Sequence, residues 1–275
     1  MRVAEMESSG ICRLYREGKE TKVESTVLQN VELEVLLPVH NEAESIECTL
    51  DEIYQAISPV ANMRFIVSED GSSDGTPQIL ENLATRYPMK LITGPKRKGY
   101  SRAVIDGLQI LEAPYVLCLD SDGQCDPADF AKFWSRRERA DVLIGWRVDR
   151  QDARLRKLLS GTFKLYYRAL FGIPIHDPSC PFVLAPRPIV KQLIPQLGIL
   201  SQGFWWEFVA RVWSHGYSIA ETPITHRLRA AGQTQVYRLR KLPGIGWTHV
   251  TGLMQIWQDY KHLAAKRVSV GMERL

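Results

Sequence analysis

The sequence predicts an α/β fold in which a mostly parallel sheet is flanked by helices and followed by C-terminal amphipathic helices. Apolar runs typical of buried strands alternate with helical patterns over residues 32–145, and this alternation indicates a parallel sheet with helices on both faces. Polar, acidic segments follow three of the apolar runs, at the strand ends where such sheets bind ligands. Basic amphipathic patterns dominate after residue 150.

The first half of the chain supplies most of the predicted sheet. Its elements are expected, in chain order, as strand 32–39, helix 42–57, strand 64–68, helix 74–87, strand 90–93, helix 99–111, and strands 115–119 and 141–145. The first helix follows from Ile46, Leu50 and Ile53, which recur at helical spacing on one face. Asp74 is expected as the N-cap of the second helix, because its side chain can accept bonds from the first turn.

The second half differs in character. Its elements are expected as helix 154–171, strand 182–185, helix 203–214, strand 217–223 and helix 250–264. In the first of these helices, Leu155 and Leu158 oppose Arg156 and Lys157, which makes it basic and amphipathic. No linker or repeat divides the chain. The predicted organisation is a flexible N-terminal arm or small hairpin (1–30), a main domain (31–235) and a C-terminal helical extension (236–275).

Composition indicates a soluble or peripherally attached protein. The 275 residues are 45% hydrophobic and 24% charged, which is ordinary for a globular chain. The five cysteines form no C-x-x-C pair, which favours a reducing compartment. The chain has no run of about 20 mainly apolar residues that would predict a membrane span, and its first residues lack the apolar core of a signal peptide.

Positive charge is concentrated in two stretches, although the net charge is only +4. Residues 132–168 hold eleven Lys or Arg against four Asp or Glu, and residues 226–241 hold five against none. Such stretches suit phosphates, an anionic lipid surface or nucleic acid. A solvated helix face explains either stretch equally well.

Two carboxylates form the strongest single signal. Asp120 and Asp122, one residue apart, follow the apolar run 115–119 at a predicted strand end. Mg²⁺ and Mn²⁺ prefer oxygen ligands and commonly share their coordination with substrate phosphates. The pair therefore indicates an enzyme of phosphorylated or nucleotide-activated substrates; a solvated turn is the alternative.

Five motifs carry a family resemblance. They are Leu-Pro-Val-His-Asn-Glu at 37–42, Glu-Asp-Gly-Ser-Ser-Asp-Gly-Thr at 69–76, Lys-Gly-Tyr around Gly99, Asp-Ser-Asp-Gly-Gln at 120–124 and Arg-Lys-Leu-Leu-Ser at 156–160. Over about residues 32–235 the chain resembles the family 2 glycosyltransferases, which have the Rossmann-like GT-A fold. Within them it looks most like the polyprenol-phosphate (dolichol-phosphate) mannosyl- and glucosyltransferases.

The resemblance implies a nucleotide-sugar site at the strand ends. The residues it assigns to that site are Pro38, His40, Asn41, Glu42, Asp70, Gly99, Asp120, Ser121, Arg229 and Gln233. Asp70 would accept hydrogen bonds from the base, and Glu69 stands where the family usually has another aspartate. Glu42 has an alternative place in the first turn of a helix. Arg229 and Gln233 would belong to a mobile loop that closes over the donor phosphates.

The same resemblance implies a metal and an acceptor site. Asp120, Asp122 and Gln124 would hold Mg²⁺ or Mn²⁺. The acceptor phosphate would be bound by Arg147, Arg156 and Ser160, since a guanidinium fork suits phosphate. A solvated basic face is the alternative for the two residues on the helix.

Asp177 and Glu207 are the candidates for a general base, and with Asp122 and Arg147 they complete the predicted catalytic set. A hydroxyl acceptor needs such a base, whereas a phosphate acceptor is already anionic and needs none. In the latter case both carboxylates would be positioning groups. Trp206 is expected in the core.

The resulting hypothesis is an inverting transferase that moves mannose or glucose from GDP-mannose or UDP-glucose to a polyprenyl (dolichyl-type) phosphate. It would be cytoplasmic and peripherally associated with the cytoplasmic face of the membrane. No nucleic acid is expected as a partner, whereas a second copy of the chain or a membrane-anchored subunit is a candidate partner. Two alternatives stay open: a GT-A transferase acting on a hydroxyl of a glycan, lipid or small molecule, and a sugar-nucleotide binding protein without turnover.

Overall fold

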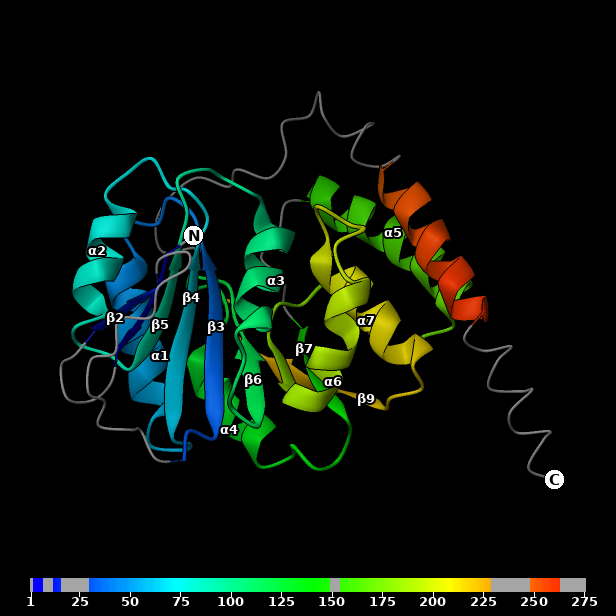
Figure 1. The fold of residues 1–275 in the computed structure, drawn as a ribbon. Coiled ribbons are helices and arrows are strands. Elements are labelled where there is room, and N and C mark those ends of the chain that lie inside the picture. Colours follow the sequence, from blue (N-terminus) through cyan, green and yellow to red (C-terminus); the bar gives the residue numbers. More distant parts are fainter. Residues whose placement is uncertain (1, 7–11, 16–29, 149–153, 229–247, 263–275) are drawn as a thin grey trace.

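The computed structural model describes residues 2–6, 12–15, 30–148, 154–228 and 248–262. Within them a nine-stranded sheet has the order β2-β1-β5-β4-β3-β6-β8-β7-β9 (Figure 1). The strands are β1 Arg2–Met6, β2 Cys12–Tyr15, β3 Leu33–Val39, β4 Met63–Glu69, β5 Met89–Thr93, β6 Tyr115–Cys118, β7 Val142–Arg147, β8 Val183–Pro186 and β9 Ile219–Ile224. The predicted α/β class is confirmed.

The sheet is mostly parallel, and its chain directions bring the predicted site together. Strands β5, β4, β3 and β6 run parallel, as do β7 and β9. Strand β8 is antiparallel to both β6 and β7, so β7 runs in the same direction as β6. The carboxyl ends of β3, β4, β6 and β7 therefore lie at one edge, where ligands bind in sheets of this kind.

Helices cover both faces of this sheet (Figure 1). They are α1 Ile46–Ile57, α2 Thr76–Leu83, α3 Tyr100–Gln109, α4 Phe130–Trp134, α5 Arg154–Phe171, α6 Arg187–Leu193 and α7 Phe204–Ser214, with 3-10 turns η1 Pro127–Asp129 and η2 Ile194–Gln196 and a further helix over 248–262. The prediction of Asp74 as an N-cap is wrong, because Gly75 holds that position. Asp74 instead accepts from the N–H of Thr76 (3.0 Å) and of Ala43 (3.2 Å).

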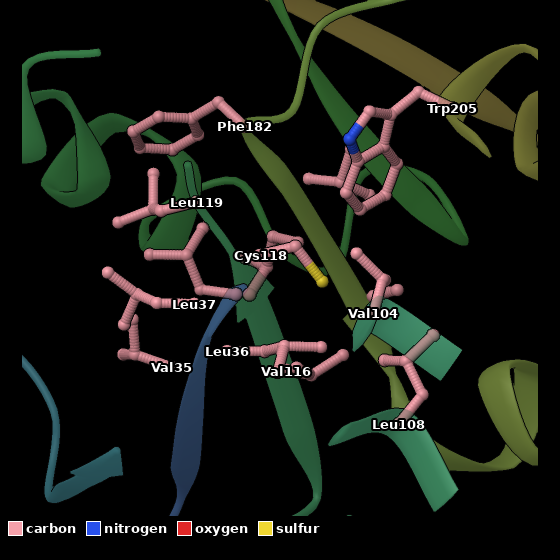
Figure 2. Close-up of a cluster of buried hydrophobic side chains, with 14 of the residues drawn as sticks. Val35, Leu36, Leu37, Val104, Leu108, Val116, Cys118, Leu119, Phe182 and Trp205 are labelled. Carbon is pink, nitrogen blue, oxygen red and sulfur yellow. The ribbon is translucent and has the colours of Figure 1, made fainter. Parts of the chain in front are cut away.

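The core lies on both sides of β3, whose seven residues are all buried. Its side chains meet those of β6, of α3 and of Trp205 from α7 (Figure 2). Gly107 permits the close approach of α3, since a Cβ there would lie 2.2 Å from Cδ1 of Leu36. The helix that begins beside the predicted site is thus held tightly on the strand that leads to it.

Both ends of the chain contribute described elements. Strands β1 and β2 pair as a hairpin and β1 pairs antiparallel with β5, so the described part of 1–30 extends the sheet. At the other end, helix 248–262 packs on α5 and α7 through Phe171 and Tyr260 (ring centroids 6.1 Å apart) and an ion pair between Arg211 and Asp259 (2.8 Å). The boundary predicted near residue 235 lies outside the described residues.

A buried ion cluster stabilises the opposite end of the strands. Lys90 Nζ lies 2.8 Å from Glu34 and 2.7 Å from Glu112, and Arg64 Nη2 lies 2.7 and 2.8 Å from the same carboxylates. Glu34 also accepts from the backbone N–H of Glu112 (2.6 Å) and of Ala113 (3.0 Å). Burial alone would raise the pKa of Glu34, but Lys90 and Arg64 lower it below its usual value. Its stabilising effect is therefore present at neutral pH and lost as the pH falls through that lowered pKa.

Replacing Glu34 by glutamine should lower the free energy of unfolding by about 3 kcal/mol, because two largely buried cations would lose a charged partner. Denaturant unfolding followed by circular dichroism measures the change. Glu112→Gln is the matched control, since this carboxylate meets the same cations but is 64% exposed, and we expect it to cost under about 1 kcal/mol. Equal losses in the two variants would contradict this account of the cluster.

Candidate active site

The exits of β3 and β4 are locked together by their own polar groups. The N–H of Asn41 donates to Ser72 Oγ (2.9 Å), and Asn41 Oδ1 accepts from the N–H of Ser73 (2.8 Å). Asn41 takes a positive φ of 55°, which asparagine tolerates better than most residues. The N–H of Glu42 donates to Thr76 Oγ1 (2.9 Å). The first two predicted motifs thus form one surface.

Glu42 lies just before α1 and not within it. Its carboxylate accepts from Ser45 Oγ (2.9 Å), and its carbonyl accepts from the N–H groups of Ser45 (3.0 Å) and Ile46 (2.9 Å). These bonds start the helix. The expectation that Glu42 lies in the helix's first turn is therefore off by one turn, and its contact with a base stays a prediction.

Asp70 ties the exit of β4 to the loop before α3. Its buried carboxylate accepts from the backbone N–H of Lys98 (2.6 Å) and of Gly99 (2.9 Å). Gly99 has a φ of +97°, and a Cβ placed there would meet nothing within 4 Å. In this structure Asp70 therefore positions Gly99 beside open space, and its recognition of a base stays a prediction.

The Asp-Ser-Asp-Gly-Gln motif (120–124) follows β6 and forms a tight turn over β3. Ser121 Oγ donates to the carbonyl of Pro38 (3.0 Å), which joins the two strand ends. Asp122 Oδ1 accepts from the N–H of Gln124 (3.1 Å), and Asp120 Oδ1 accepts from the hydroxyl of Tyr100 (2.6 Å). Gln124 Nε2 donates to the carbonyl of Arg227 (3.4 Å). Both aspartates and the glutamine thus belong to one short loop.

The donor set of this loop suits a hard divalent cation. Carboxylate and amide oxygens are the ligands that Mg²⁺ and Mn²⁺ prefer, and substrate phosphates usually complete their coordination. In the part of the chain that the structure describes, no group of three or more His, Cys, Asp or Glu is placed to hold a metal. By the chemistry of their oxygens, Asp120, Asp122 and Gln124 fit a divalent cation as a partial ligand set, which the oxygens of a bound diphosphate would complete.

The segment after β9 lies along the same loop. Cys125 and His226 form an isolated antiparallel bridge, and the N–H of Arg227 donates to the carbonyl of Gln124 (2.7 Å). The guanidinium of Arg227 reaches Asp126 (2.6 Å) and Glu52 (2.5 Å). The segment that leads toward the predicted closing loop therefore pairs with the end of the Asp120–Gln124 loop, called the metal loop below because it holds the predicted metal ligands. Arg229 and Gln233 themselves lie outside the described residues.

Arg147, at the end of β7, is held by a buried ion pair. Its Nε and Nη2 donate to the two oxygens of Asp177 (2.7 and 2.9 Å), and Nη2 also donates to Ser179 Oγ (2.8 Å). Burial alone would lower the pKa of Arg147, but the bond to Asp177 and neighbouring groups raise it, so the charge is kept. The backbone N–H of Asp177 donates in turn to Glu221 (2.8 Å). The predicted base candidate Asp177 is thus engaged in orienting Arg147.

Glu207, in the first turn of α7, holds the loop that precedes this helix. Its side chain is 0% exposed and accepts from the backbone N–H groups of Ile199 (3.2 Å) and Leu200 (2.9 Å). Burial raises its pKa. In this structure Glu207 therefore holds the loop before α7, and its role as a general base stays a prediction.

Trp206 lies in the core, as predicted. Its ring packs edge-on against those of Phe163 and Tyr167, with ring centroids 4.7 and 4.9 Å away. Helix α5 runs over Arg154–Phe171, the predicted range. The side chains of Arg156 and Ser160 fall outside the described part of that helix, so their contact with an acceptor phosphate stays a prediction.

Sequence reasoning missed two residues of the site. Tyr100, which contacts Asp120, is the last residue of the Lys-Gly-Tyr motif, and its place beside Gly99 was the available signal. Arg227 stands at the rim of the metal loop within the basic stretch 226–241, and nothing in its local pattern separates it from the other cations there. His40 lies at the β3 exit as predicted.

The sheet order and the acidic strand end define the class of the GT-A glycosyltransferases. A family model described as "Glycosyl transferase family 2" matches residues 34–194. The chain therefore belongs to glycosyl transferase family 2.

Curated relatives carry lipid-phosphate names. The chain is 27% identical to the dodecaprenyl-phosphate galacturonate synthase of Rhizobium johnstonii, over 74% of this chain and 62% of that protein. It is 27% identical to the dolichol-phosphate mannosyltransferase of Pyrococcus furiosus, over 78% and 65%, and 26% identical to the polyprenol monophosphomannose synthase of Mycolicibacterium smegmatis, over 74% and 80%. The match spans less than two thirds of the first two relatives.

Solved structures share the fold. The glucosyl-3-phosphoglycerate synthase of Mycobacterium tuberculosis, crystallised with Mn²⁺, uridine diphosphate and phosphoglyceric acid, matches with a TM-score of 0.61 and 18% identity over 82% of this chain and 78% of that one. TarS of S. aureus matches with a TM-score of 0.52 and 16% identity over 70% and 58%. At these identities the likeness concerns the fold alone.

Proposed function

We propose that this protein is an inverting glycosyltransferase that moves a hexose from a nucleoside-diphosphate sugar to a polyprenyl phosphate. The observation that carries the proposal is the loop of Asp120, Asp122 and Gln124, joined through Ser121 to the exit of β3. This is an oxygen-rich site for a metal and a diphosphate at the ligand edge of the sheet. The names of the three curated relatives support a lipid-phosphate acceptor. GDP-mannose and UDP-glucose are the proposed donors.

The proposed mechanism is a direct displacement at the anomeric carbon. A divalent cation held by Asp120, Asp122 and Gln124 would stabilise negative charge on the departing nucleoside diphosphate. Arg147, kept charged and oriented by Asp177, is placed to contact a phosphate group from the end of β7. The acceptor oxygen is already anionic, so no protein base is required. This agrees with the engagement of Asp177 and Glu207 in bonds to the protein.

Helices α5 and 248–262 lie side by side (Figure 1). Because the proposed acceptor is a lipid, we assign these two helices to contact with the membrane surface. Leu165 is 72% exposed, and Val250 and Met254 are each 37% exposed. Lys261 Nζ lies 4.3 Å from the ring centroid of Trp257. Apolar and aromatic side chains with flanking cations suit a helix lying in a membrane interface. No helix among the described residues is long and apolar enough to cross a membrane.

The proposal predicts lipid-dependent transfer. Purified protein with Mn²⁺ should transfer sugar from one member of a panel of GDP-mannose, UDP-glucose and UDP-galacturonic acid to polyprenyl phosphate, measured as radiolabelled sugar in the organic phase. The same reaction with polyprenol, which lacks the phosphate, is the control and should give no product. Transfer only to hydroxyl acceptors would overturn the lipid-phosphate assignment. Binding of a sugar nucleotide without turnover on any acceptor would overturn the enzymatic proposal.

A further inference from the structure

Two aromatic residues connect the metal loop to the start of α7. The indole Nε1 of Trp205 donates to the hydroxyl oxygen of Tyr100 (2.7 Å), and that hydroxyl donates to Asp120 Oδ1 (2.6 Å). Trp205 is buried over the same cluster as Val104 and Cys118 (Figure 2). Neither aromatic residue belongs to the acidic motif, yet their bonds end on one of its carboxylates.

The direction of this chain of bonds is set by its chemistry. An indole nitrogen can only donate, so the tyrosine oxygen must accept from it. The single proton of the phenol is then free to point at the carboxylate. A hydroxyl bonded to an ionised carboxylate makes a short, charge-assisted bond, and the observed 2.6 Å falls in the range expected for one.

We propose that Tyr100 and Trp205 are positioning residues that set the orientation of the Asp120 carboxylate for the divalent metal and the nucleotide. The inference rests on the proposed function for the site but concerns two residues to which the sequence motifs assign no role, since Tyr100 only closes the Lys-Gly-Tyr motif and Trp205 lies in none. Partners of metal-binding side chains fix the orientation of those side chains, and their loss typically weakens metal affinity about 10- to 100-fold. Tyr100 would act directly on Asp120, and Trp205 would act through Tyr100.

Both residues stand on elements that are fastened to each other. Ser101 Oγ, one residue after Tyr100, lies 2.6 Å from the carbonyl oxygen of Leu200 and 3.0 Å from that of Ser201. Glu207, one turn after the start of α7, holds the N–H of Leu200 from the other side (2.9 Å). The N-terminus of α3 and the first turn of α7 therefore share one loop. By holding this loop, Glu207 would keep the indole of Trp205 within hydrogen-bond distance of the Tyr100 hydroxyl.

The test is a titration of Mn²⁺ in the presence of GDP or UDP, followed by electron paramagnetic resonance of the free ion, which requires no acceptor and no turnover. We expect Tyr100→Phe to weaken Mn²⁺ binding about 10-fold or more. Trp205→Phe, which leaves the tyrosine in place but frees its hydroxyl to turn, should weaken it by a smaller factor. Tyr115→Phe is the matched control, because this tyrosine lies at the far end of β6, packed on Trp134 (5.4 Å), and it should bind as the unchanged protein does.

The outcomes separate the inference from the proposed function. If Tyr100→Phe binds Mn²⁺ as tightly as Tyr115→Phe does, the inference is overturned, whatever the acceptor proves to be. If the unchanged protein binds Mn²⁺ with the nucleotide and Tyr100→Phe binds it weakly, the inference holds even when polyprenyl phosphate is not the acceptor. Should Tyr100→Phe not fold, Trp205→Phe decides alone: unchanged Mn²⁺ affinity in that variant overturns the inference.

Discussion

Replacing Asp122 by alanine should reduce the rate of sugar transfer by roughly a thousandfold or more. Without the metal, the transition state would lose several kcal/mol of charge stabilisation. The carboxylate lies in the turn after β6, beside Asp120 and in contact with the N–H of Gln124 (3.1 Å). Initial rates over a range of Mn²⁺ concentrations measure the effect. A variant that retains full activity would show that the metal is bound elsewhere.

A second substitution separates the two tasks of Asp122. Asparagine keeps an oxygen that can accept from the N–H of Gln124, so Asp122→Asn should preserve the turn while it loses the charge. We expect the asparagine variant to unfold at the same denaturant concentration as the unchanged protein but to transfer sugar nearly as slowly as the alanine variant. Near-normal transfer by Asp122→Asn would mean that this carboxylate serves the turn and not the metal.

Much of this fold could be predicted because its signals are local. Six of the seven buried residues of β3 are apolar, the exception being Glu34, and α5 has a helical period over the whole of Arg154–Phe171. The short helices α4 and α6 carry no such signal; Pro186 and Pro188 border the start of α6, where proline is compatible with either a turn or a first helical residue. Helices α1 and α2 begin later than the sequence predicts, because Asn41 and Asp74 form hydrogen bonds that join the two strand ends.

The site was predictable as far as its motifs reach and no farther. Residues such as Asp120 and Asp122 are recognised by type and spacing within five positions of sequence. The partners that orient them come from distant segments: Trp205 lies 105 positions from Tyr100 in sequence, and Arg227 lies 103 positions from Gln124. No periodicity or spacing rule connects such pairs, because tertiary packing alone brings them together. The partners of Asp177 and Glu207 were unpredictable for the same reason.

Replacing Asp177 by alanine should lower the free energy of unfolding by about 3–5 kcal/mol, because it leaves the guanidinium of Arg147 buried without its charged partner. Both oxygens of Asp177 accept from this guanidinium, and Ser179 Oγ donates to one of them (2.9 Å). Asp141→Ala is a matched control: this exposed carboxylate stands just before β7, the strand that ends at Arg147, and accepts from Ser218. We expect that control to cost less than about 1 kcal/mol.

Combining Asp177→Ala with Arg147→Met tests whether the buried charge is the cause. The double variant holds no unpaired cation, so it should recover part of the lost stability, and its unfolding free energy should exceed that of Asp177→Ala alone. Both variants should transfer sugar poorly, because neither presents an oriented arginine at the end of β7. The two variants should therefore differ in their free energy of unfolding but not in their rate of sugar transfer. If Asp177→Ala folds as stably as the Asp141→Ala control and yet loses transfer, then Asp177 acts on the acceptor itself, and a hydroxyl acceptor that needs a base would replace the phosphate.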